Sequence, residues 1–125
     1  MNDIRGDSMG TVSIILRRPP YGSCDASEAI RHALGGVTTE EMAIRLILLD
    51  AGVNAARKGQ DTSRTDYLNI EAQLKDCIDM GVKVYVDKIS LDANLENNEI
   101  IDGVIIANSS EIARLIKESD TTMIF

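Results

Sequence analysis

The sequence predicts an α/β fold, a three-layer α/β/α sandwich around a mostly parallel five-stranded sheet. Short apolar segments alternate with segments in which apolar residues recur every three or four positions. The connections between the apolar segments are too long for hairpins, so the strands are expected to pair in parallel with helices crossing between them. With 125 residues, 44% of them hydrophobic, the chain is long enough for one core and too short for two ordinary domains.

Five segments are expected to be strands. Each is rich in β-branched or aliphatic residues and is almost continuously apolar, as strands buried on both faces of a sheet are. They are TVSIIL (11–16), MAIRLILL (42–49), GVKVYV (81–86), GVIIA (103–107) and TTMIF (121–125).

Three segments have the apolar spacing of helices that pack one face on a sheet. The first carries Ala26, Ala29, Ile30, Ala33 and Leu34, the second Tyr67, Ile70, Leu74, Cys77 and Ile78, and the third Ile112, Leu115 and Ile116. We expect Gly35 and Gly36 to end the first helix, Gly81 to end the second, and Ser109 or Ser110 to cap the third. The polar segment SLDANLENNEIID (90–102) is expected to hold one helical turn, around 91–95.

Composition excludes several classes of protein. A net charge of −7 without clustered Lys and Arg argues against nucleic-acid binding. No apolar run approaches the roughly 18 residues of a membrane span, and no secretory signal is recognisable, so we expect a cytoplasmic protein that does not bind membranes. Two cysteines are too few for a disulfide scaffold or a zinc site, so no metal or other cofactor is expected. Residues 1–10 are expected to form a flexible tail before a single domain, 11–125.

A candidate crevice lies where the carboxyl ends of the parallel strands meet, because loops and helix N-termini converge there. The residues expected to line it are Tyr21, Gly22 and Ser23 after the first strand, Asp50 after the second, Asp87 after the third and Asn108 after the fourth. Asp50 and Asp87 are either paired carboxylates or helix caps. The segment beginning at Asn108 is either a capping element or an anion site.

These segments resemble the DsrE/DsrF-like family. The resemblance rests on PPYGS, LLDAGVNAARKGQ, YLNIEAQLKDCIDMGVKVYV and IDGVIIANSSEIARLIKESDTTMIF, in this order across 11–125. It is strongest to the YchN branch, with the sulfur-relay TusBCD and DsrEFH subunits as relatives. The resemblance implies a parallel α/β/α subunit, assembly into trimers or hexamers of like or related chains, and, in some members, transport of persulfide sulfur on one cysteine.

The chain departs from the family at that cysteine. In the sulfur-carrying members it follows a G-V-x-φ-x-φ run, where φ is apolar; here the run is 81–86 and the next residue is Asp87. A carboxylate cannot carry a persulfide because it lacks the sulfur that takes part in thiol exchange. The resemblance therefore implies an accessory or structural subunit, beside a related cysteine-bearing subunit.

The two cysteines of the chain suggest different environments. Cys77 lies on the apolar face of its helix and is expected to be buried and inert. Cys24 lies at the start of the first helix, where backbone N–H groups favour a thiolate, although Asp87 would oppose it if the two loops meet. Three functions remain open at this point: an accessory subunit, a sulfurtransferase or redox protein that uses Cys24 as its catalytic residue, and a binding module for a small polar ligand at the crevice.

Overall fold

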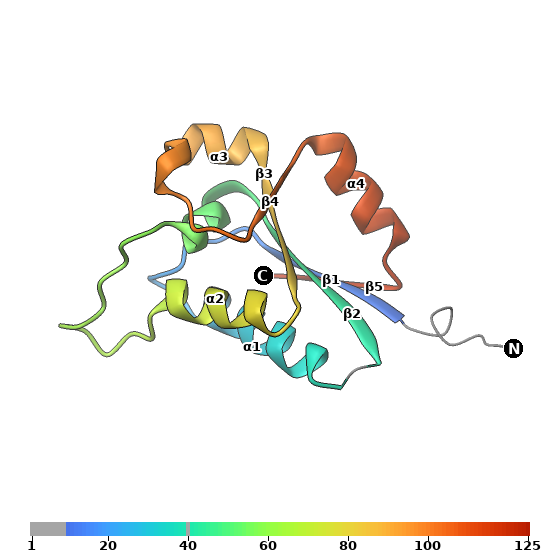
Figure 1. The fold of residues 1–125 in the computed structure, drawn as a ribbon, viewed down its shortest axis with the longest axis horizontal. Helices are drawn as coiled ribbons and strands as arrows, with labels where there is room; N and C mark the ends of the chain where they lie inside the picture. Colours follow the sequence, from blue (N-terminus) through green and yellow to red (C-terminus); the bar gives the residue numbers. More distant parts are fainter. Residues whose placement is uncertain (1–9, 40) are drawn as a thin grey trace, which may run out of the picture.

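The computed structural model describes residues 10–39 and 41–125. Its centre is a five-stranded sheet in the order β4-β3-β2-β1-β5, and every pair of neighbouring strands is parallel (Figure 1). The strands are β1 (Gly10–Leu16), β2 (Met42–Leu48), β3 (Lys83–Asp87), β4 (Ile105–Ala107) and β5 (Thr121–Ile124). The predicted α/β fold with five parallel strands is confirmed. Residues 1–9 of the expected tail lie outside the described residues, whereas Gly10 begins β1 and was wrongly assigned to the tail.

The central strands form the core because their side chains are apolar on both faces. β1 pairs with β2 over seven residues, from Gly10 with Met42 to Leu16 with Leu48. Most of the core lies on one face of the sheet, and a smaller cluster around Ile15 and Ile47 lies on the other. This continuous burial explains why the strand sequences show little alternation.

Helices cover both faces. α1 (Asp25–Val37) and α2 (Ile70–Asp79) lie below the sheet in Figure 1, and α4 (Ser109–Glu118) lies above it. α3 (Lys88–Asn94) and the 3-10 helix η2 (Asp50–Ala56) pack together beyond the carboxyl ends of the strands, and a short 3-10 turn, η3 (Asn97–Glu99), follows. No helix in the described part of the chain is long and apolar enough to cross a membrane.

The glycines expected to end the first helix lie inside it. α1 continues through Gly35 and Gly36 to Val37. A Cβ on Gly36 would lie 2.7 Å from Cδ1 of Ile44 on β2, so the glycine lets the helix approach the sheet. The prediction was wrong because tertiary packing outweighs the cost of about 1 kcal/mol that glycine imposes on a helix. Gly81 behaves as expected, following the end of α2 with a φ of +100°.

Other helix boundaries also differ from the predictions. Tyr67 precedes α2, which begins at Ile70, and is exposed rather than part of the buried helix face. Asn108, not Ser109 or Ser110, caps α4. The turn expected around 91–95 is a seven-residue helix that begins earlier, at Lys88. The 3-10 helix after β2 was not predicted.

Candidate functional site

Asp50 and Asp87 are brought together by a residue that was not predicted, Ser90. Asp87 is the last residue of β3 and the N-cap of α3, and its Oδ2 accepts hydrogen bonds from Ser90 N at 3.1 Å and Ser90 Oγ at 2.6 Å. Ser90 Oγ in turn accepts a hydrogen bond from the backbone N of Asp50 at 2.8 Å. The Asp87 carboxylate is therefore engaged in capping α3 and holding Ser90. The three-residue spacing between Asp87 and Ser90 is that of an N-cap and was a signal available in the sequence.

Asp50 has an unusual backbone conformation at the carboxyl end of the sheet. Its φ of +52° makes it a non-glycine residue in the left-handed region. Its carboxylate accepts a hydrogen bond from Arg17 Nε at 2.9 Å, and both side chains are more than half exposed, at 56% and 61%. An ion pair this exposed adds at most about 1 kcal/mol to stability. The side chain thus offsets little of the strain in its own backbone.

Replacing Asp50 measures this strain. Asp50→Gly is expected to be more stable than Asp50→Ala by about 1 kcal/mol, because glycine enters the left-handed region without a steric cost. Both variants lose the ion pair with Arg17, so their difference isolates the backbone. Urea unfolding followed by circular dichroism gives the two free energies of unfolding. Equal stabilities would show that the backbone at this position relaxes when the side chain is lost.

The loop after β1 is tied to the start of α2. The Tyr21 hydroxyl donates to Oε1 of Gln60 and accepts from the backbone N of Ile70 at 3.2 Å. Gln60 is also held by Glu71, whose carboxylate accepts from Gln60 N at 2.9 Å. Burial acts to raise the pKa of Glu71, but hydrogen bonds from Gln60 and Lys75 outweigh it and leave that pKa below its usual value. Tyr21 therefore links two loops through bonds that satisfy its hydroxyl.

The remaining crevice candidates also make local bonds. Gly22 adopts a φ of +98°, which turns the loop towards α1, and Ser23 Oγ accepts from Asp25 N at 3.3 Å. Asn108 forms a reciprocal capping box with Glu111: its side chain accepts from Glu111 N at 2.9 Å, and its own N donates to the Glu111 carboxylate at 3.1 Å. The expected capping interaction at 108–111 is thus present. Binding of a ligand by these residues stays a prediction.

The two cysteines lie in opposite environments. Cys24 is exposed at the position before α1, and its side chain makes no capping bond. Cys77 is fully buried on α2, where burial first, and the charge of Asp76 second, raise the pKa of its thiol to about 11. Because β2 separates β1 from β3, the ends of these two strands are about 10 Å apart. Among the described residues, no hydrogen bond joins Cys24 to Asp87.

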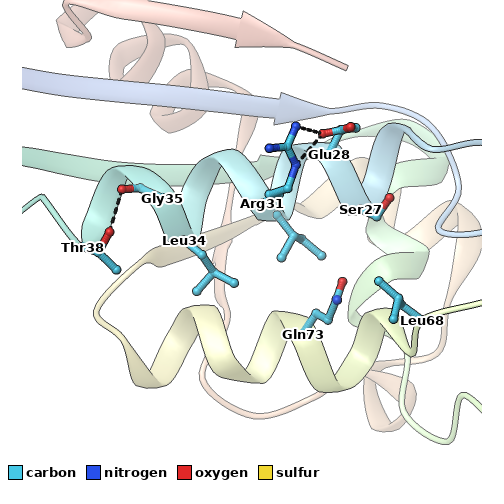
Figure 2. Close-up of a pocket in the computed structure, with 9 residues that line it drawn as sticks. Ser27, Glu28, Arg31, Leu34, Gly35, Thr38, Leu68 and Gln73 are labelled. Carbon is cyan, nitrogen blue, oxygen red and sulfur yellow. Dashed lines mark hydrogen bonds and ion pairs between the residues drawn. The ribbon is translucent and has the colours of Figure 1, made fainter.

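A groove of about 600 Å³ lies elsewhere, between α1 and the start of α2. Figure 2 shows Leu34 and Leu68 on its apolar walls, with the Arg31–Glu28 ion pair on α1. Thr38 at the end of the groove bonds to the carbonyl of Gly35 at 2.8 Å (Figure 2). None of the residues predicted for the crevice lines this groove, and its charged side chains are paired with each other.

Comparison with protein families decides the relationship, because the model of the DsrE/DsrF-like family matches residues 11–125. The chain belongs to the DsrE/DsrF-like family. The crystal structure of YchN from E. coli, at 27% identity, superimposes with a TM-score of 0.85 and covers 94% of this chain and 100% of that chain. A protein of unknown function from Methanobacterium thermoautotrophicum shares the fold, with a TM-score of 0.69 at 13% identity over 93% of this chain and 99% of that chain.

Two uncharacterised archaeal proteins are similar along nearly their whole length. One from Methanocaldococcus jannaschii is 31% identical over 90% of this chain and 97% of its own. One from Methanopyrus kandleri is 27% identical over 95% of this chain and 97% of its own. The similarity to each of these relatives therefore extends over nine-tenths or more of this chain.

Proposed function

We propose that this DsrE/DsrF-like chain is an oligomeric accessory subunit of the sulfur-relay superfamily, acting in the cytoplasm beside a cysteine-bearing partner that carries the sulfur. One observation bears most of the proposal. The residue directly after Val86 is Asp87, and its carboxylate is used to cap α3 and hold Ser90. A residue committed to these bonds has a structural role, and its oxygens cannot accept a persulfide.

The buried cysteine, Cys77, does not take over the role of a sulfur-carrying cysteine. With a pKa of about 11, the thiol of Cys77 stays protonated at neutral pH, and only a thiolate attacks a persulfide or disulfide sulfur. Its position inside the core also denies access to a protein donor. Sulfur transfer by this chain would therefore depend on Cys24.

A second candidate function, sulfur transfer by Cys24, is favoured by the exposure of that thiol at the beginning of α1. No capping hydrogen bond holds the Cys24 side chain, and its neighbour Asp25 is paired with Arg18 at 3.1 Å.

Persulfide loading separates the two candidates. The chain is incubated with a cysteine desulfurase and L-cysteine, and retained sulfur is measured by mass spectrometry of the intact protein under non-reducing conditions. We expect the wild-type chain to retain no more sulfur than the Cys24→Ser variant. Accumulation of one sulfur atom on the wild type that Cys24→Ser abolishes would reject the accessory role and establish Cys24 as the carrier.

A variant at position 87 tests whether a cysteine placed at the end of β3 could carry sulfur in this chain. Asp87→Cys in the Cys24→Ser background is expected to gain one sulfur atom from the same donor, since the thiol then ends a strand at the crevice. Asp87→Ser in that background is the matched control, because it retains a capping oxygen but carries no sulfur. Equal, zero loading of both would show that position 87 is not accessible to a donor.

A further inference from the structure

A second groove lies on the other side of α1, between that helix and β5, and we call it the α1–β5 groove. Its volume is about 500 Å³. It includes Met42 and Thr121, the first residues of β2 and β5, so it lies towards the amino ends of the strands, away from Asp87 at the end of β3. Its apolar walls are formed by Val12, Ile14, Met42, Ile44 and Met123. A groove of this size and lining suits the apolar body of a small organic molecule.

The polar lining of the α1–β5 groove is basic. It consists of Arg31, His32, Thr39 and Thr121, and none of the described residues that line the groove is acidic. Three other hollows on the described surface each contain at least one carboxylate. The chain as a whole has 20 acidic residues against 13 lysines and arginines. A groove that holds an arginine and a histidine without an acid therefore favours an anionic group.

Arg31 and His32 each have a donor left for such a group. Arg31 binds the carboxylate of Glu28 through Nε, at 2.9 Å, and through Nη2 (Figure 2), which leaves Nη1 without a partner among the described residues. The His32 ring lies beside Phe125, with ring centroids 5.4 Å apart, and its Nδ1 is 2.8 Å from the carbonyl oxygen of Glu28. Because a carbonyl oxygen only accepts, Nδ1 donates and Nε2 remains for a ligand. A carboxylate, with two acceptor oxygens, matches these donors.

Gly35 gives an independent reason to expect a ligand at this surface. Glycine disfavours helix relative to alanine, yet Gly35 and Gly36 both lie inside α1. Gly36 is explained by Ile44, which a Cβ would meet at 2.7 Å, whereas nothing lies within 4 Å of a Cβ on Gly35. Gly35 is exposed and lines the α1–β5 groove. Packing within the chain does not require this glycine, but close approach of a ligand to the helix backbone does.

We propose that the α1–β5 groove binds a small amphipathic carboxylic acid. Its apolar body lies over Gly35 and against the two methionines of the groove, whose flexible side chains adapt to apolar ligands. Its carboxylate accepts hydrogen bonds from Arg31 and His32. Cys24 and Asp87 do not line this groove, so binding here is independent of the proposed sulfur-relay role.

Calorimetric titration of the full chain with octanoate measures this binding, and 1-octanol is the matched probe without a carboxylate. Arg31→Gln removes the charged donor. Arg114→Gln is its matched control, because both arginines are exposed on a helix and each is paired with a glutamate of its own helix. Gly35→Leu covers the helix backbone with a side chain that favours helix. Circular dichroism verifies that the variants fold.

We expect the wild type to bind one octanoate per chain, and 1-octanol to bind more weakly by about tenfold or more. Arg31→Gln and Gly35→Leu are each expected to weaken octanoate binding by about tenfold, while Arg114→Gln binds like the wild type. Absence of binding by the wild type would overturn the proposal, as would equal affinity for octanoate and 1-octanol or affinity that neither variant lowers. Binding that appears only when an oligomer dissociates on dilution would assign the groove to a second copy of the chain and would also overturn it.

Discussion

Gly52→Ala is expected to destabilise the fold by about 4 kcal/mol or more, the size of effect reserved for severe steric or core changes. A Cβ at position 52 would lie 2.1 Å from the carbonyl oxygen of Leu16 and 2.8 Å from its carbonyl carbon. Both are backbone atoms at the end of β1, and that oxygen already accepts a hydrogen bond from Leu49 N at 3.0 Å. Relief of the clash requires η2 to move away from the sheet, which also displaces Asp50.

Gly35→Ala is the matched control for this prediction. Gly35 is also a glycine inside a helix, but nothing lies within 4 Å of the Cβ that it would gain. The control is expected to be more stable than the wild type by about 0.5 to 1 kcal/mol, because alanine favours helix more than glycine does. Urea unfolding of both variants gives the comparison. Loss of less than about 1 kcal/mol by Gly52→Ala would contradict the close approach of η2 to β1.

The strands of this protein were predictable because their segments are short and rich in apolar, β-branched residues; burial on both faces holds for the central strands β1 and β2, whereas β4 and β5 are largely exposed. All five expected segments are strands, and the crossover lengths correctly indicated parallel pairing. The first helix was harder to delimit. Gly35 and Gly36 look like a helix end in the sequence, yet α1 continues through both of them to Val37. At Gly36 the helix packs closely against Ile44 on β2. That contact depends on the packing of two distant segments, which no local pattern contains.

The same distinction holds for the candidate site. The rule that crevices form at the ends of parallel strands singled out Asp50 and Asp87, and the structure places both at the carboxyl ends of their strands, while a crevice lined by them stays a prediction. The link between them depends on Ser90, whose hydroxyl accepts a hydrogen bond from the backbone N of Asp50, 40 positions away in the sequence. Tyr21 was expected at the crevice, but its hydroxyl is engaged with Gln60 and Ile70. Which hydrogen bonds a side chain makes across the fold could not be predicted from strand positions alone.

The use of Asp87 as a helix cap connects the fold to the proposed function. An aspartate is among the best N-cap residues and cysteine is not, so a change between them at this position alters the stability of α3 as well as the chemistry. In the proposed accessory role no sulfur is carried at this position, and the carboxylate satisfies Ser90 N and Ser90 Oγ together. The accessory role and the local stability of the crevice therefore favour the same residue.

Cys77 is expected to make the protein lose stability in alkali. Burial raises the pKa of its thiol to about 11 in the folded state, while an unfolded thiol titrates near 8.5 to 9. The folded chain binds the thiol proton more tightly than the unfolded chain does. The stability that comes from the protonated thiol is therefore complete below about pH 9 and is lost as the pH rises towards 11. A shift of this size corresponds to at most about 3 kcal/mol.

Cys77→Ala isolates that contribution, because tyrosines and lysines titrate in both proteins. Near neutral pH the variant is expected to be less stable than the wild type by about 1 kcal/mol, owing to the small cavity left beside Leu74. Above pH 9 the wild type loses stability faster, and the two curves of unfolding free energy cross before the folded pKa of about 11 is reached. Urea unfolding under reducing conditions across this range measures the crossing. Parallel curves would mean that the thiol of Cys77 has no raised pKa and is open to solvent. Cys77 would then no longer be excluded as a sulfur carrier.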